Sequence, residues 1–348
     1  MKFALESKQV TLPSEPEVTP TVESISEVYE GMLASYMELS DAQKGIDEVH
    51  QVMENINLSM KMIQKGGIEA VKLLNIDKSV ESLVGVAEEK LTVEASKEGF
   101  GDAANAAWEK LKEWVKKFVE AIKKFLNYLG EKMRVLFDKL NAYKKGYQKG
   151  VAEGKAEYSK EFINFVLPEG TYVLLQGIVE ARLEHGISKL VADLAKFADI
   201  VYSKKNLDDP ELDAIGEKLS NSSVFDLMEN EGVALACDGK ADTLAKAGYS
   251  SVDQVFDEME RLGKFITESS KTIKAAMDKL AVIYTMSKSE NPDSDMTKNL
   301  HYVGNCCSQT LTFIKRLAVV HGTTTDALGK VIEELEKKFN IEDNDSGN

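Results

Sequence analysis

Histidine and cysteine are the residue types in this chain that could ligate a transition metal or act as nucleophiles, and they are few. They are His50, His185, His301, His321, Cys237, Cys306 and Cys307. No two histidines are spaced as metal ligands usually are, and His301 precedes Cys306 by five residues, nearly a turn and a half of a helix. We therefore expect no metal site and no bound cofactor, and we interpret these side chains as partly buried helix residues with reduced thiols.

A catalytic centre is equally hard to assemble from the sequence. Cys237, in the segment ALACDGK, would need a base and an orienting group close in space before it could act as a nucleophile. The chain lacks the phosphate-binding GxxxxGKS/T loop, a GxGxxG turn after a strand, and the hydrolase motifs HExxH and GxSxG. Carboxylate pairs such as Glu333–Glu334 lie on expected solvent faces of helices. We expect no catalytic residue and no small-molecule substrate, and we interpret the chain as a non-enzyme.

Charge is distributed unevenly along the 348 residues, whose formal net charge is -15. Residues 1–98 have a net charge of -9, residues 108–149 of +7, and residues 150–348 of -12. The protein as a whole should therefore repel nucleic acid and anionic lipid. An acidic head, a basic belt and an acidic body indicate separable parts.

The sequence also restricts the compartment. No stretch reaches about 18 apolar residues, so a membrane-spanning helix is not expected. The first ten residues, MKFALESKQV, are not followed by the long apolar run of a secretory signal. The adjacent Cys306 and Cys307 would form a strained disulfide, so we expect reduced thiols and assembly inside a cell.

Apolar residues that recur at steps of three and four predict an all-α fold, a multi-helix bundle with long amphipathic helices. Of six prolines, three lie between residues 13 and 20, where extended chain is expected. The pattern becomes helical at residue 22, and Ser40 is predicted to cap the helix that ends at Gly66 and Gly67. A shorter helix is predicted over residues 78–91.

Further helices are predicted over residues 190–202, 251–287 and 296–320. Ser251 and Gln254 have the spacing of a capping box at the start of the second of these. Gly322 is expected to end the third, a last helix is expected to begin at Thr323–Thr325, and residues 341–348 are expected to be a disordered tail. Periodicity does not decide whether the apolar run at residues 171–181 is a strand or a buried helix.

The strongest periodicity lies in residues 108–145 and predicts a helix of roughly forty residues. Its apolar stripe should be buried against other helices and includes Trp108, Leu111, Phe118, Ile122, Phe125 and Leu129. Lysines occupy the opposite face, and the Gly- and Lys-rich residues 144–160 are a candidate hinge. The basic face allows three interpretations: an ordinary solvated surface, an electrostatic contact with packaged DNA or an acidic protein, or a membrane-surface helix anchored by Trp108 and Trp114.

The candidate residues for a DNA or partner contact are Lys116, Lys117, Lys123 and Lys124. A membrane contact is disfavoured, because membrane-surface helices normally act alone whereas this one is embedded in a helical chain.

The segment SKEGFGDAANAAWEKLKEWVKKFVEAIKKF resembles the processing region of internal head proteins of large tailed bacteriophages. In that family a prohead protease removes an acidic helical propeptide by cutting after a glutamate that has a small or aliphatic residue two positions before it. The triplet Ser96-Lys97-Glu98, followed by Gly99, fits this pattern and makes Glu98–Gly99 the first candidate bond. Glu94–Ala95 is a second candidate, and Glu6 also fits the loose pattern.

This resemblance implies a virion protein that is assembled in the host cytoplasm and packed inside the capsid. Its implied partners are the prohead protease, other virion proteins and packaged DNA. The implied organisation is a propeptide-like region at 1–98, a basic helix at 99–150 and a C-terminal helical bundle at 151–340. Two other classes stay open: a membrane-active protein, such as a pore former or an ejected factor, and a cytoplasmic scaffold that binds partner proteins.

Overall fold

Nearly all of the chain that the computed structural model describes is helical, and no strand occurs in that part. The described residues are 22–66, 93–152, 183–207, 209–220, 251–286 and 294–345. The all-α prediction is confirmed. The predictions for residues 1–20, 78–91 and 171–181, and for Cys237, lie outside the described residues.

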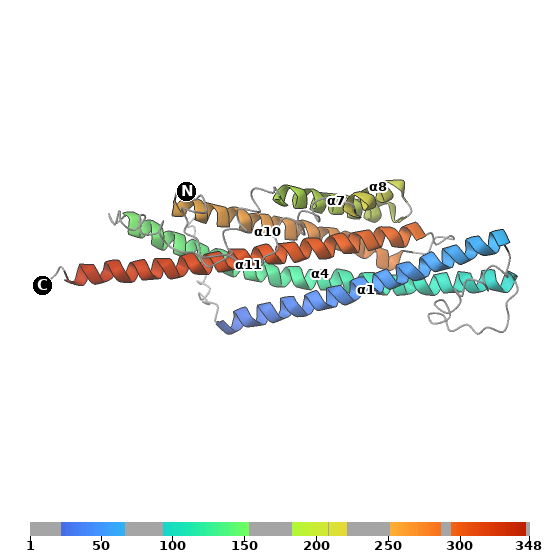
Figure 1. The fold of residues 1–348 in the computed structure, drawn as a ribbon, viewed down its shortest axis with the longest axis horizontal. Helices are drawn as coiled ribbons and strands as arrows, with labels where there is room; N and C mark the ends of the chain where they lie inside the picture. The colour runs from blue at the N-terminus through green and yellow to red at the C-terminus, as the bar shows by residue number, and fades with distance from the viewer. Residues whose placement is uncertain are drawn as a thin grey trace, which may run out of the picture.

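Four long helices lie side by side in an elongated bundle (Figure 1). They are α1 (Val22–Gly66), α4 (Val93–Ala152), α10 (Val252–Leu280) and α11 (Ser294–Asp345). α4 and α11 run in one direction, and α1 and α10 run in the other. α4 and α11 each pack against all three of the other long helices, so these two helices form the centre of the bundle.

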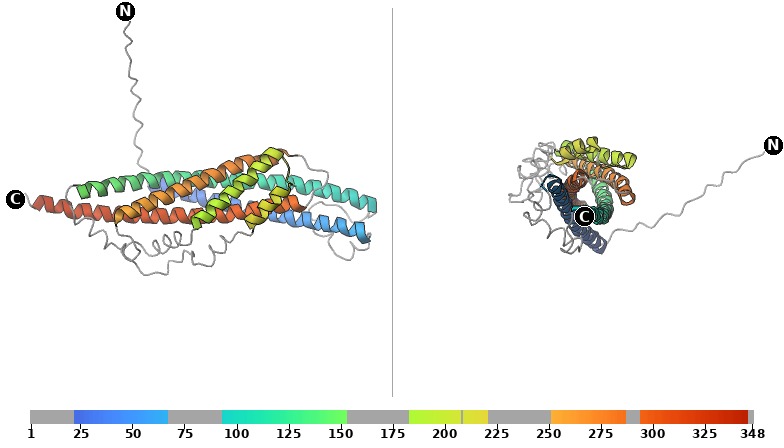
Figure 2. Two further views of the ribbon diagram at one scale, coloured as in Figure 1. Left: turned by 90° about the horizontal axis from the view of Figure 1, so that it is seen from above. Right: turned by 90° about the vertical axis from the view of Figure 1, so that its right-hand side faces the viewer.

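Two shorter helices cover part of this bundle (Figure 2). α7 (Leu183–Lys204) packs on α10, and α8 (Pro210–Ser220) packs on α11. A short 3-10 helix, η1 (Ala281–Thr285), continues from the end of α10. At the start of α10, the Ser251 side chain accepts a hydrogen bond from the backbone N–H of Gln254, which is one half of the predicted capping box.

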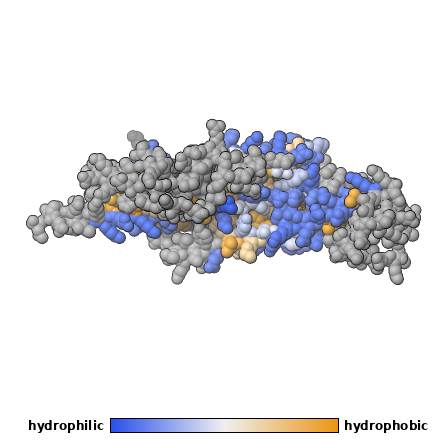
Figure 3. Space-filling model, viewed as in Figure 1, coloured by the Kyte–Doolittle hydropathy of each residue, from blue (hydrophilic) through white to orange (hydrophobic). Residues whose placement is uncertain are grey.

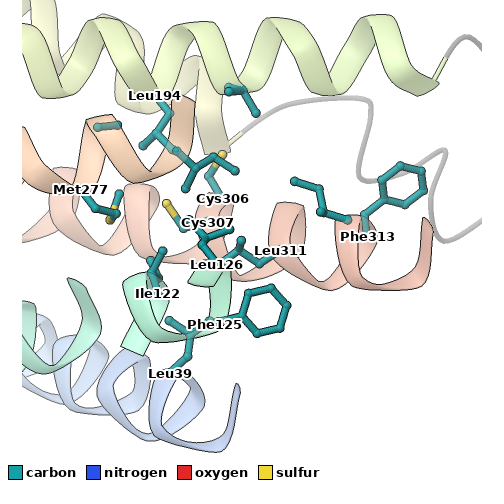
Figure 4. Close-up of a cluster of buried hydrophobic side chains, with 14 of the residues drawn as sticks. Leu39, Ile122, Phe125, Leu126, Leu194, Met277, Cys306, Cys307, Leu311 and Phe313 are labelled. Atoms are coloured by element: carbon teal, nitrogen blue, oxygen red, sulfur yellow. The ribbon is translucent and has the colours of Figure 1, made fainter. Parts of the chain in front are cut away.

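The core is formed where apolar stripes of these helices meet (Figure 4). The close-up brings together side chains of five helices: Leu39 of α1, Phe125 of α4, Leu194 of α7, Met277 of α10 and Leu311 of α11. The stripe predicted for residues 108–129 is confirmed, since its six named side chains are at most 3% exposed. Sustained burial of this kind, rather than local propensity, stabilises long helices in water.

Two predicted helix ends are wrong, because α1 and α11 continue through them. Ser40 lies inside α1 and is not an N-cap. Gly322 lies inside α11, where it packs against Leu136 of α4. The hydroxyls of Thr323 and Thr324 donate to the carbonyls of residues 319 and 320 in the preceding turn, so these threonines are accommodated within the helix.

α4 is longer than predicted, at 60 residues. It continues to Ala152, so the first part of the candidate hinge at residues 144–160 is helical. α11 likewise continues to Asp345 through most of the expected tail. Tertiary packing overrides isolated glycines, each of which costs a helix only about 1 kcal/mol.

Candidate functional site

The candidate cleavage bonds lie at the beginning of α4. Glu94, Ala95, Glu98 and Gly99 all fall within the first seven residues of this helix. Gly99 and Gly101 are both helical in this structure. The residues between them and Trp108 are mostly alanine, the best helix former, and they extend the helix through the glycines.

The four candidate lysines do not form one free basic patch. Lys124 Nζ lies 2.8 Å from the Glu38 carboxylate of α1, and this hydrogen bond raises the pKa of Lys124. Lys123 Nζ lies 2.5 Å from the carboxylate of Asp278, a residue of α10. These two side chains therefore point toward different neighbouring helices.

Lys117 and Lys116 lie on the outer side of α4. Lys117 pairs with Glu113 on its own helix, at 2.8 Å, and its Nζ lies 4.3 Å from the centroid of the Trp114 ring. The Lys116 side chain is exposed. These two residues are the candidates that face solvent without joining α4 to another helix.

Other lysines of α4 also pair with acidic residues on neighbouring helices. Lys139 lies 3.2 Å from Asp326 of α11. Lys144 lies 2.7 Å from Glu260 and 3.1 Å from Asp257, both on α10, and the hydrogen bond to Glu260 raises the pKa of Lys144. Together with the pairs of Lys123 and Lys124, these contacts connect the basic helix to each of the three long helices beside it.

α1 packs on α4 through glycines that accept aromatic rings. The Trp114 ring lies directly on Gly45, and the Tyr128 ring lies on Gly31, so that an added Cβ at either glycine would overlap the ring. The two glycines are 14 residues apart, as are the two aromatic residues, and 14 residues are about four helical turns. The contacts therefore repeat along one antiparallel interface, which we call the glycine–aromatic interface.

The other neighbour of α1 is α11, and here the contacts are polar. His301 Nδ1 lies 2.6 Å from Asp47 Oδ1, and His50 Nδ1 lies 2.9 Å from Thr297 Oγ1. The polar seam, as we call it, is made of Tyr36, Gln43, Asp47 and His50 of α1 with Thr297, His301, Asn305 and Thr312 of α11.

The two histidines of the polar seam stack on each other, with ring centroids 5.4 Å apart. Burial lowers the pKa of His50, with Glu54 and Asp47 acting in the opposite direction. This pairing was not predicted from the sequence, since the partners are about 250 residues apart in the chain. A usable signal was present: Gln43 and His50 interrupt an apolar stripe at a spacing of seven residues.

The thiols and the remaining described histidines offer little chemistry. Cys306 and Cys307 are free and buried, and burial raises the pKa of Cys306 to about 12 and that of Cys307 well above its ordinary value. His321 is fully buried, and this lowers its pKa to about 4. Within the described ranges, no group of three or more His, Cys, Asp or Glu side chains could hold a metal ion.

The burial of the two tryptophans and the hydropathy of the surface bear on the interpretation of α4 as a membrane-surface helix. Trp108 is buried and Trp114 is partly buried against α1, so neither ring stands out as an anchor. The described surface in Figure 3 is largely hydrophilic, with small hydrophobic areas. No described helix has an apolar stretch of the length and hydropathy that a bilayer crossing requires.

Comparison with known proteins identifies a family that matches the chain. The model of a family described as phiKZ-like phage internal head proteins matches residues 17–204. No curated protein and no solved structure matches the chain. The matched residues contain α1, α4 and α7, and thus both helices of the glycine–aromatic interface together with the candidate cleavage bonds. They make up more than half of the chain, which therefore belongs to the phiKZ-like phage internal head proteins, held inside the capsid of a bacteriophage.

Proposed function

We propose that this internal head protein is a non-catalytic structural component, and that a phage head protease cuts it after Glu98. The observation that carries the proposal is the family match over residues 17–204, which includes the Ser96-Lys97-Glu98 triplet and the helices around it. The residues before the triplet are acidic, and those after it form the basic belt.

The position of the bond within α4 sets a physical condition for cleavage. A protease binds its substrate in an extended form, so the first turns of α4 must open. Helix ends lack part of their backbone hydrogen bonds and fray easily, and Gly99 and Gly101 weaken this end further. The buried positions described for α4 run from Ala104 to Tyr147, all of them beyond the bond. Fraying of the helix end therefore gives access without opening the described core.

A structural role agrees with the state of the reactive groups. A thiol whose pKa is about 12, as at Cys306, is protonated at neutral pH and is a poor nucleophile. The polar seam uses His50 and His301 to join two helices. These groups contribute to packing, which is the role expected of a protein that fills and organises the interior of a head.

The DNA contact stays a prediction, and Lys116 and Lys117 are the best-supported candidates for it, since neither joins α4 to another helix. Lys123 and Lys124 would have to give up ion pairs with α10 and α1 before they could bind phosphate. Duplex DNA binding should therefore weaken in a Lys116→Glu, Lys117→Glu variant, and it should depend on salt. Equal and negligible binding by the variant and the parent chain would remove the DNA role.

The proposed cut is tested on protein from purified phage heads. Chemical labelling of amino termini followed by mass spectrometry should identify Gly99 as the first residue. A Glu98→Gln substitution in the phage should abolish this terminus, whereas Glu94→Gln should leave it unchanged. A chain that still begins at residue 1 in mature heads would contradict the cut, and a terminus at Ala95 would place it at the second candidate bond.

A further inference from the structure

The helix α1 belongs to the part of the chain that the proposed cut separates, yet it contributes to the core of the bundle. Its described buried hydrophobic residues extend over about seven turns and are Met32, Leu39, Ala42, Ile46, Val49, Val52, Met53 and Ile56. A segment that is simply discarded needs no such stripe. We propose, resting on the cut proposed above, that α1 stays bound to the 99–348 body as a separate chain after the Glu98–Gly99 bond is broken.

α1 and α4 fit together closely. The Gly31–Tyr128 and Gly45–Trp114 contacts bring the backbone of α1 close to ring faces on α4 at two points four turns apart. In the same region, the ring centroids of Tyr36 and Phe125 are 6.4 Å apart. None of these contacts needs the covalent link between the two helices, so all of them survive the cut.

α11 also holds α1 in an antiparallel alignment. Along the polar seam, Tyr36 pairs with Thr312 and His50 with Thr297, so the residue number rises on one helix as it falls on the other. A helix that slid by one turn would leave these polar groups without partners in a partly buried interface, which is costly. The two interfaces thus select a single position for α1.

Electrostatic attraction also favours α1 remaining bound to the body. α1 carries eight acidic and three basic residues, while the basic belt lies on α4. Lys124 pairs with Glu38 across this interface, and on α11 Lys315 Nζ lies 4.8 Å from the centroid of the Tyr36 ring. An acidic helix is therefore attracted to the surface that its departure would uncover.

Departure would also uncover apolar surface. Phe125 and Leu39 belong to the buried cluster shown in Figure 4, and both lie where α1 meets α4. Without α1, the Trp114 and Tyr128 rings would lose the helix on which they lie. Large exposed apolar patches on a soluble protein favour association, so a body without α1 should aggregate or bind another helix.

The test uses the full chain with an external protease. A glycine-flanked recognition sequence for a sequence-specific protease is inserted between Glu98 and Gly99, and the folded protein is cut until mass spectrometry shows no intact chain. Size-exclusion chromatography under native conditions should then return both fragments in one peak, in equal amounts. Elution of the 99–348 fragment without its partner, whether as a monomer or as an aggregate, would overturn the proposal.

A matched pair of variants shows whether the glycine–aromatic interface is responsible. Gly45→Leu places a side chain in the position of the Trp114 ring, so the cut variant should lose the 1–98 fragment. Gly130→Leu, a glycine of α4 with nothing within 4 Å of an added Cβ, should keep it. Retention by both variants would contradict the role assigned to this interface. Because the external protease makes the cut, the outcome is independent of whether the phage enzyme cleaves the natural bond.

Discussion

The two interfaces of α1 differ in chemistry although they belong to the same helix. Toward α4 it presents glycines and apolar side chains that accept Trp114 and Tyr128. Toward α11 it presents Asp47, His50 and other hydrogen-bonding residues of the polar seam. The first interface removes apolar surface from water, and the second specifies which polar groups must meet.

This difference suggests that the two interfaces of α1 have separate roles in stability and alignment. Apolar burial supplies most of the free energy of folding but tolerates alternative alignments, since one apolar stripe resembles another. Polar positions inside a helical interface contribute little net stability and can fix the alignment of helices. We therefore expect substitutions on the α4 side to have large effects on stability and substitutions on the α11 side to have small ones.

The largest effect is expected from Phe125→Ala. The side chain is fully buried next to Tyr36, and its removal leaves a cavity in a core shared by several helices. The free energy of unfolding, measured by urea titration, should fall by about 3–5 kcal/mol. Met37→Ala, on an α1 side chain that is 62% exposed, should change it by less than about 0.5 kcal/mol. Equal losses for the two variants would refute the packing described for α4.

Gly45→Ala should have the next largest effect, with a cost of about 1–3 kcal/mol, because the new methyl group overlaps the Trp114 ring and forces α1 away from α4. The control is the same substitution at Gly130, where an added Cβ meets open space. At this position alanine is a better helix former than glycine, so the free energy of unfolding should rise by up to about 1 kcal/mol. The midpoint temperature of thermal unfolding should therefore fall for Gly45→Ala and rise for Gly130→Ala. A change of the same sign in both variants would count against the glycine–aromatic interface.

A smaller effect is expected at the polar seam. The Asp47 and His301 side chains form a 2.6 Å contact but are 39% and 27% exposed, so water screens the pair. A double-mutant cycle with Asp47→Ala and His301→Ala should give a coupling free energy of at most about 1 kcal/mol. A coupling free energy as large as the stability lost in Phe125→Ala would contradict the separate roles proposed for the two interfaces.

The smallest effect is expected from the protonation of His50, and it depends on pH. Burial lowers its pKa in the folded protein, Lys298 and His301 act in the same direction, and Glu54 and Asp47 oppose it. The neutral ring is therefore favoured on folding. Its contribution to stability is present above the unfolded-state pKa of about 6.5 and is lost as the pH falls toward the lower folded-state pKa.

The stability difference between the natural chain and a His50→Gln variant should accordingly narrow as the pH is lowered below about 6.5. His321, whose pKa is lowered to about 4, titrates in the same sense in both proteins, so its contribution cancels in this difference. A difference that widens on acidification would mean that the charged form of His50 is the one stabilised by folding.

Much of the fold could be predicted from the sequence, because the stripe from Trp108 to Leu129 repeats for many turns and only one helix face can bury it. Local end signals were less reliable. A serine at position 40 and a glycine at position 322 can end a helix, but packing on neighbouring helices carries α1 and α11 through them. Gln43 and His50 mark where polar residues interrupt the stripe of α1, but their partners in the polar seam could not be predicted, since the alignment depends on how two helices far apart in the chain are brought together.

Native-state hydrogen exchange of the intact protein tests most directly whether α1 belongs to the folded core. If it does, the backbone amides between Leu39 and Ile56 should exchange as slowly as those between Leu111 and Leu129 of α4, because both sets open only when the bundle unfolds. Fast exchange along α1 beside slow exchange along α4 would contradict this account, and α1 would then be a loosely attached segment that a cut could release.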